Sequence, residues 1–173
     1  MVAPFLALAM LGAADVSFYL RAKLKLDTAA TSLAQVTSQY ASLYADDFTT
    51  LFKVSQLAAG DGVSVTGQFG GTVISGVTNV AGTQKIAWQR ISPSASPVVS
   101  QFGVAGATPT LPANYVLPIG ATLVVTEVYT KLSPWNFAAA ILGGPGDPTS
   151  VGSVALFQPR LASLNSILAG TRP

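Results

Sequence analysis

The chain has 173 residues, nine of them Lys or Arg and seven Asp or Glu; half are hydrophobic and only 9% are charged. A soluble domain typically has about 25% charged residues, so this composition suits a membrane protein or one covered by neighbours. There is no cysteine and no histidine, which excludes disulfides, thiol nucleophiles, Ser-His-Asp triads and the usual zinc sites. The basic residues beyond Lys25 are scattered, whereas nucleic-acid binding requires a cluster.

The first segment, residues 2–20, is apolar on every face and carries one charge, Asp15. A membrane-spanning helix needs about 20 apolar residues, and a soluble core helix is seldom apolar all round. The segment therefore predicts a transmembrane helix, or a helix buried among other copies in a filament core. A signal peptide is disfavoured because no Lys or Arg precedes the apolar run. A basic triplet, Arg21, Lys23 and Lys25, follows it.

Residues 21–59 continue the helical pattern as an amphipathic segment. Apolar residues recur at alternating spacings of three and four, as in a heptad repeat. This stripe consists of Leu26, Ala29, Leu33, Val36, Tyr40 and Leu43. Since Gly60 is a typical terminator, we expect one continuous or gently bent helix of about 55 residues, roughly 80 Å long. The alternative is two helices, of which one spans a membrane and the other packs on the domain.

From residue 61 the composition changes to Val, Thr, Gly, Ser and Ile with turn signals between, which is typical of strands. The predicted strands are residues 63–66, 72–80, 84–91, 121–132 and 153–157, with a weaker pattern at 101–107. Alternation would place Ile86, Trp88 and Arg90 on one face. The predicted fold is therefore α+β: a long hydrophobic helix, residues 1–60, followed by a head, residues 61–173, with a small antiparallel sheet.

Several segments, taken together and in order, resemble one family. They are GAADVSFYLR, RAKLKLDTAATSLA, KIAWQR, LPANYVLPIGATLVVTEVYTKLSPW and ALFQPRL. The chain is similar in these segments to the TadE-like minor pilins, or pseudopilins, of the tight-adherence (Tad/Flp) pilus, which are type IV-like pilins. The resemblance implies a lollipop, in which the helix starts in the inner membrane and carries a sheet-bearing head. It also implies assembly into a surface pilus that serves adhesion.

The resemblance and the charge pattern give opposite membrane orientations. The positive-inside rule would place Arg21, Lys23 and Lys25 in the cytoplasm, together with the head. The resemblance implies a single-pass protein of the bacterial inner membrane with its head outside the cytoplasm, which later reaches the cell surface in an extracellular filament. We follow the resemblance, because basic residues upstream of this sequence would change the charge balance.

Asp15 is the one charge in the apolar stretch. A carboxylate inside a bilayer costs about 2.5–3.5 kcal/mol on insertion scales and usually has a partner. We expect it to pair with a basic residue of another subunit; the alternative is that it lies at the membrane interface near Arg21. The candidate subunit contacts are Asp15, Arg21, Lys23, Lys25, Phe5, Leu8, Leu11, Phe18, Tyr115 and Trp135.

The head offers no pattern that predicts a catalytic residue, a metal ligand or a bound cofactor. Asp46, Asp47 and Asp61 lack the spacing of a calcium loop, and we expect them on a solvated helix face and in a turn. Glu127 lies on the strongest predicted strand, where we expect it to be buried and paired with Arg160 or Lys131. Such a pair is structural rather than catalytic.

These observations predict a non-enzymatic structural subunit of a Tad-type or type IV-like filament. Its partners would be copies of itself or other pilins, through the N-terminal helix, and the inner membrane before assembly, with no nucleic acid. The alternative is a membrane-anchored binding protein whose β-rich head recognises a surface ligand or a pilus partner without entering a filament. Whether the subunit belongs to the shaft, the tip or an initiation complex is left open by the sequence.

Overall fold

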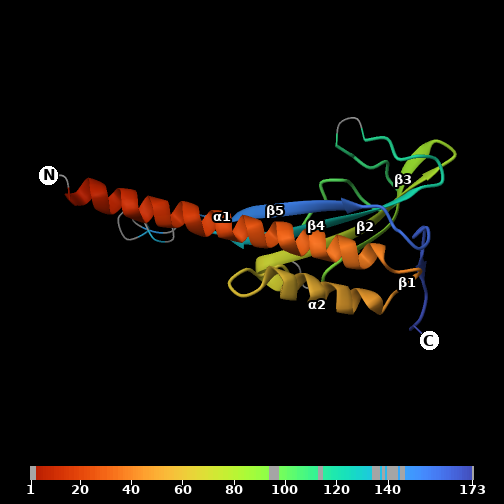
Figure 1. Ribbon diagram of the computed structural model, residues 1–173, viewed down its shortest axis with the longest axis horizontal. Helices are drawn as coiled ribbons and strands as arrows, with labels where there is room; N and C mark the ends of the chain where they lie inside the picture. The colour runs from red at the N-terminus through yellow and green to blue at the C-terminus, as the bar shows by residue number, and fades with distance from the viewer. Residues whose placement is uncertain are drawn as a thin grey trace.

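The computed structural model describes residues 3–93, 98–112, 115–133, 137, 139, 144 and 147–172. Its first helix, α1 (Ala3–Ser38), is continuous, and its N-terminal half extends beyond the sheet (Figure 1). The C-terminal half lies against an antiparallel sheet. The predicted α+β layout, a long apolar helix followed by a small antiparallel sheet, is therefore confirmed.

The predicted continuous helix through Ala59 is wrong, because the chain reverses direction after Ser38. The side-chain hydroxyls of Thr37 and Ser38 each donate back to a carbonyl oxygen of the preceding turn, at 2.8 Å. Hydroxyl groups that bond in this way compete with the continuation of a helix. A second helix, α2 (Asp47–Ala59), then runs back beside α1 (Figure 1), as in the alternative interpretation of the sequence.

Burial of the aromatic face of α2 explains why the chain turns back. Phe48, Leu51 and Phe52 are buried in one cluster with Trp88 of the sheet. The rings of Phe48 and Trp88 meet edge to face, with centroids 5.7 Å apart. Full burial of a side chain of this size stabilises the fold by about 1.5–3 kcal/mol. A straight continuation of α1 would carry all three away from the head.

The end of α2 organises the segment that follows. Gly60 has a φ of +67° and donates its N–H to carbonyl oxygens of the last turn, which confirms it as the predicted terminator. The Gln56 side chain donates to the carbonyl oxygen of Val63 at 2.9 Å and accepts the N–H of Val65 at 3.0 Å. Residues 63–66, predicted as a strand, are therefore held by a side chain and lie outside the sheet.

The described residues form a four-stranded antiparallel sheet in the order β3-β2-β4-β5. Its strands are β2 (Gly70–Val80), β3 (Thr83–Ile91), β4 (Thr122–Leu132) and β5 (Thr149–Phe157), and the turn η1 (Gly67–Phe69) precedes β2. The four corresponding predicted strands are confirmed to within a few residues at their ends. A parallel pair, β1 (Leu43–Tyr44) with β6 (Ile167–Leu168), ties the connection between the helices to the C-terminal segment.

A β-bulge in β3 corrects the predicted orientation of its side chains. The register between β3 and β2 shifts at Ala87, and an extra residue in one strand reverses the alternation beyond it. Trp88 and Arg90 therefore face α2, where both contact Phe48. Ile86 lies instead in the core cluster on the opposite face of the sheet. The prediction that all three share one face is wrong.

Each face of the sheet has its own cover. Helices α1 and α2 cover one face, and the α1 contact is made mainly by small side chains. These are Ala22, Ala29, Ala30 and Ala34, which pack with Val128, Val151 and Ala155. On the other face, Phe102 and Leu117 from the segment between β3 and β4 pack on Val77 and Val125. The molecule therefore has three layers: the helix layer, formed by α2 and the C-terminal half of α1, the sheet, and the covering segment on its other face.

Gly76 gives a direct test of the packing between α2 and the sheet. A Cβ atom at this position would lie 2.3 Å from atoms of the Trp88 indole, and that ring is fixed by its hydrogen bond to the carbonyl oxygen of Leu164 at 2.7 Å. We predict that Gly76→Ala lowers the free energy of unfolding by about 1–3 kcal/mol. Chemical denaturation of the full chain in detergent measures this change through tryptophan fluorescence.

Gly12→Ala is the matched control, because no atom lies within 4 Å of a Cβ at Gly12 and alanine is favoured inside a helix. This control should keep or slightly raise stability. Equal stability of Gly76→Ala and the parent would contradict the close approach of Trp88.

Candidate functional site

The candidate functional site is the part of α1 that the head leaves uncovered. Residues 5–10 are all exposed, with Phe5 at 73% and Met10 at 75%. Within the described residues, α1 is the one helix long and apolar enough to cross a membrane, and only 11% of its most apolar window is buried. Length and composition are shared with signal sequences, but a soluble core helix would be mostly buried. Residues 5–10 of α1 are therefore an apolar surface that the described part of the chain leaves uncovered.

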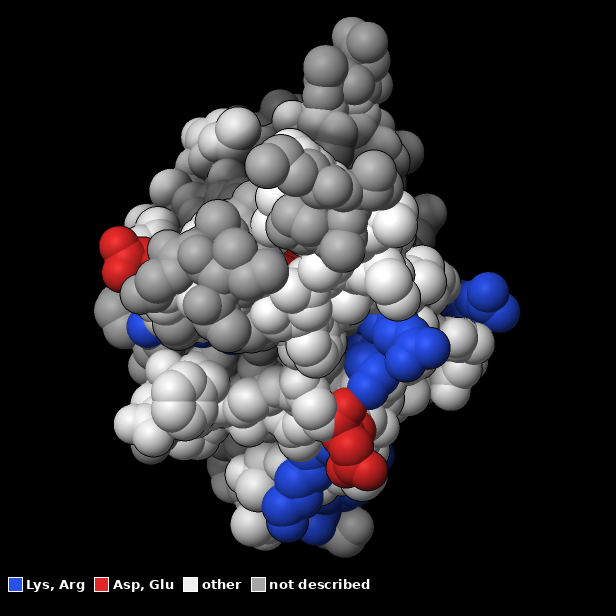
Figure 2. All heavy atoms as spheres, turned by 90° about the vertical axis from the view of Figure 1, so that its left-hand side faces the viewer, with Lys and Arg blue, Asp and Glu red and all other residues white. Residues whose placement is uncertain are grey.

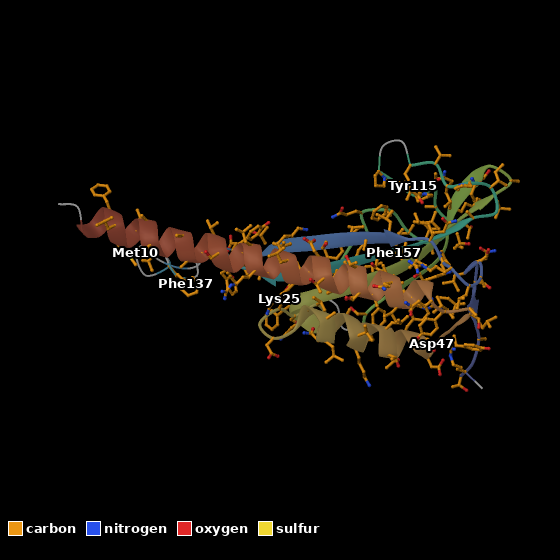
Figure 3. The ribbon with its side chains drawn as sticks, viewed as in Figure 1. Met10, Lys25, Asp47, Tyr115, Phe137 and Phe157 are labelled. Atoms are coloured by element: carbon orange, nitrogen blue, oxygen red, sulfur yellow. The ribbon has the colours of Figure 1, made fainter. Side chains whose placement is uncertain are left out.

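The predicted contact residues are distributed over both ends of the molecule. Phe5 and Leu8 are exposed on the projecting part of α1, and Leu11 and Phe18 are partly buried. Tyr115 is exposed on a loop of the head, far from Met10 on α1 (Figure 3). The structure therefore does not bring Tyr115 together with the helix residues. The prediction for Trp135 lies outside the described residues.

Asp15 contacts the loop that follows β4 in its own chain. Its Oδ1 atom accepts the backbone N–H of Phe137 at 2.9 Å. The ring of Phe137 also meets the ring of Phe18 of α1 edge to face, with centroids 6.2 Å apart, and Phe137 lies beside this helix (Figure 3). Part of the carboxylate is thus satisfied within the subunit. The pairing of Asp15 with a basic residue of another subunit remains a prediction.

The basic triplet lies where α1 enters the head. The Nζ atom of Lys23 donates to the carbonyl oxygen of Gly152 at 2.6 Å and lies 3.4 Å from the carboxylate of Asp27. Lys25 donates through Nζ to the carbonyl oxygen of Asp61, and Arg21 is exposed. Two of the three side chains therefore fasten α1 to the head. Sequence reasoning missed these partners because both acceptors are backbone carbonyls, which any residue type supplies.

A cavity of about 370 Å³ lies between α1 and the neighbouring ends of β4 and β5. Most of its lining is apolar. The lining residues are Asp15, Val16, Phe18, Tyr19, Leu20, Leu132, Ser133, Thr149, Ser150 and Val151. The cavity therefore joins the projecting half of α1 to the end of the sheet nearest to it.

Glu127 is fully buried on the face of the sheet away from the helices, as expected, but its predicted partners are wrong. Its carboxylate accepts the hydroxyl of Ser100, the N–H of Gln101 at 2.8 Å and the phenol of Tyr129 at 2.7 Å. The pKa of Tyr129 is raised, mainly by burial and secondly by its hydrogen bond to Glu127. The phenol therefore stays protonated and donates. The prediction failed because it considered only opposite charges, whereas three neutral donors satisfy this carboxylate.

This arrangement fixes a loop to the sheet. The hydrogen bonds from Ser100 and Gln101 hold the start of the segment that covers the outer face. In the described part of the chain, no group of three or more Asp, Glu, His or Cys side chains lies together as metal ligands would. In the geometry observed, the Glu127 carboxylate joins the covering segment to β4.

Asp47 is not on a solvated face, which corrects the expectation from sequence. Its Oδ2 atom accepts the Arg172 guanidinium and the Tyr44 N–H, each at 2.9 Å. Burial alone would raise the pKa of Asp47, but the hydrogen bonds from Arg172 and Tyr44 outweigh it, and the pKa is lowered. The guanidinium also lies over the ring of Tyr40, 4.9 Å from its centroid. Together these contacts fasten the C-terminal segment to the connection between the helices.

Comparisons with known proteins find no match for this chain among family models, curated proteins or solved structures. The relation to TadE-like pilins therefore remains a resemblance of the segments described above. The function is inferred from the geometry of α1 and the head.

Removal of the Glu127 carboxylate tests its role as the anchor of the outer layer. Glu127→Ala leaves Ser100, Gln101 and Tyr129 without their common acceptor, and we predict a loss of about 3 kcal/mol in the free energy of unfolding. Hydrogen exchange of the Gln101 amide should become faster in the same variant. Tyr129→Phe removes one donor and should cost less. A Glu127→Ala chain with unchanged stability would contradict this assignment.

Proposed function

We propose that this chain is a non-enzymatic structural subunit of a Tad-type or type IV-like filament, assembled through the uncovered half of α1. The observation that carries the proposal is the contrast along one helix. Residues 5–10 are exposed, whereas Ala22, Leu26 and Ala30 are at most 2% exposed. Apolar surface in water costs about 25 cal/mol per Å², so the uncovered half requires a bilayer or the helices of other subunits.

The layout supports this proposal. A projecting apolar helix whose other half packs on an antiparallel sheet is the arrangement that the resemblance to type IV-like pilins implies. In this proposal α1 crosses the bacterial inner membrane once, with the head outside the cytoplasm. It then moves into an extracellular filament that serves adhesion. The membrane covers the helix before assembly, and neighbouring helices cover it afterwards.

Small residues on the uncovered half favour close packing with other helices. Ala9 and Ala13 are four residues apart and both exposed, and a Cβ on Gly12 would meet no atom of this chain within 4 Å. Small residues at this spacing let two helices approach closely within a membrane or filament core. A simple anchor would not need them. This feature therefore supports the filament over the anchored protein.

One observation favours the alternative, a membrane-anchored binding protein. Apolar side chains are exposed on the loop before β4, with Val116 at 77%, Ile119 at 73% and Tyr115 at 41%. Exposed apolar residues of this kind mark contact surfaces. They would suit a head that binds a surface ligand or a pilus partner. Shearing of cells separates the two functions, since it releases a filament subunit into the medium and leaves an anchored protein with the membranes.

Enlarging the small residues tests the packing of α1 in a filament. We predict that the double variant Ala9→Leu, Ala13→Leu still enters the membrane fraction, because leucine is apolar. It should yield at least tenfold less sheared filament, since overpacking costs about 1–3 kcal/mol at each contact. Electron microscopy and immunoblots of sheared and membrane fractions measure both quantities.

The matched control for that experiment is Ala41→Leu, Ala45→Leu, which makes the same change at exposed positions between the helices. It should leave both fractions unchanged. Normal filament yield from the first double variant would contradict close helix packing. If the parent chain yields no sheared filament at all, the anchored alternative is favoured.

Asp15 can be tested by separating its charge from its hydrogen bond to Phe137. If Asp15 pairs with a basic residue of another subunit, both Asp15→Ala and Asp15→Asn should reduce filament yield, because both remove the charge. The head should stay folded in both variants by near-ultraviolet circular dichroism. If Asp15 serves only its own loop, Asp15→Asn should assemble normally, since its amide oxygen can still accept the N–H.

A further inference from the structure

We propose that the end of the head from which α1 emerges docks on phospholipid headgroups and holds the head flush on the bilayer. The inference rests on the proposed insertion of α1 in a membrane. We call this surface the base. It consists of residues 19–25 of α1, the turn 60–62, η1, and the neighbouring ends of β4 and β5.

The boundary between the apolar stretch and the head sets the distance between the base and the membrane. The apolar stretch ends at Leu20. The residues that follow already belong to the head, because Ala22 is buried there and Lys23 and Lys25 are bonded to it. Since no polar stalk separates the apolar stretch from the head, a bilayer that takes up the stretch as far as Leu20 has the base at the level of its headgroups.

Contacts between distant segments assemble the base into one surface. An open hollow of about 590 Å³ brings together the 60–62 turn, Phe69 of η1 and Lys131 of β4. Lys25 joins α1 to this hollow through its bond to the carbonyl oxygen of Asp61. The cavity beside Tyr19 and Leu20 extends the same surface to Leu132.

The side chains exposed at the base suit the interfacial zone of a bilayer. Phe69 is 59% exposed, Leu24 65% and Tyr19 48%. Aromatic residues are enriched at the headgroup level, where an apolar ring can lie against the upper acyl chains. Long basic side chains extend from the same level to phosphates. Arg21 and Lys131 are exposed there.

The charges of the base favour ordinary phospholipids over a demand for anionic ones. Figure 2 views this end of the molecule, where basic side chains lie at the lower right and bottom with an acidic side chain between them. The carboxylate of Asp27 is engaged by Lys23 and by the hydroxyl of Ser153, and Asp61 and Asp147 are exposed. Both signs are therefore present, which matches headgroups that carry a phosphate and a cation.

Site-directed spin labelling of the full chain in phosphatidylcholine vesicles tests this proposal. The chain contains no cysteine, so Gln68→Cys places a single nitroxide beside Phe69, and Thr83→Cys places one at the distal turn between β2 and β3. Both positions are exposed. We expect the label at position 68 to show a several-fold higher ratio of oxygen to nickel-chelate accessibility than the label at position 83.

Reversal of a lysine charge provides a second test. Lys131→Glu should lower the ratio at position 68 towards that at position 83, because it removes a contact to phosphate. Lys85→Glu makes the same change at an exposed position on β3 near the distal turn and should have no effect. Addition of phosphatidylglycerol should change the ratio little in the parent chain.

The outcomes separate this inference from the proposed function. If carbonate washing extracts the chain from the vesicles, α1 does not span the membrane, and both proposals fall. If the chain resists carbonate but positions 68 and 83 are equally accessible to the chelate, only docking of the base is overturned. A label at 68 shielded from both oxygen and chelate would show that another copy covers the base, which also overturns it.

Discussion

The structure depends on the close packing of the alanine face of α1 against β4 and β5. Small side chains let the helix approach the sheet so closely that the hydroxyl of Thr126 donates to the carbonyl oxygen of Ala30 at 2.8 Å. The hydroxyl of Ser153 reaches the carboxylate of Asp27 in the same interface. Hydrogen bonds between fixed partners set the position of the helix along the strands, which apolar contacts alone would leave less well defined.

That position divides α1 into two halves with different surroundings. The half from Ala22 to Ser38 packs on the sheet, whereas the half before Leu20 contacts the described residues of its own chain only near Asp15 and Phe18 and exposes residues 5–10. The basic triplet marks the boundary, since Lys23 and Lys25 bind carbonyl oxygens of the head. One helix therefore serves both as a structural element of a domain and as its attachment to lipid or to other subunits.

The sequence predicted the elements whose signals are local. The apolar stretch, the four sheet strands and the terminator Gly60 all follow from composition and periodicity. The reversal after Ser38 does not, because it is decided by the burial of Phe48, which depends on a tryptophan 40 positions later in the sequence. The bulge at Ala87 and the neutral donors around Glu127 likewise depend on the paired strand and the covering loop.

For the candidate site, too, the sequence predicted the features with local signals and not the contacts between distant segments. The projecting apolar helix and Asp15 are visible in the sequence, because an unbroken apolar run with a single charge is a local pattern. The bond from Phe137 to Asp15 is not, because it joins residues 122 positions apart. A residue pattern cannot show which backbone groups meet across such a separation.

The alignment of α1 with the strands has a mechanical consequence. The helix and the strands run nearly along the same axis, and the chain ends lie at opposite ends of the molecule (Figure 1). Tension on the projecting half of α1 would therefore act as shear along its contact with the sheet. The bonds at Lys23, Asp27 and Ala30 would share that load. Such an interface resists pulling better than one whose bonds separate one after another.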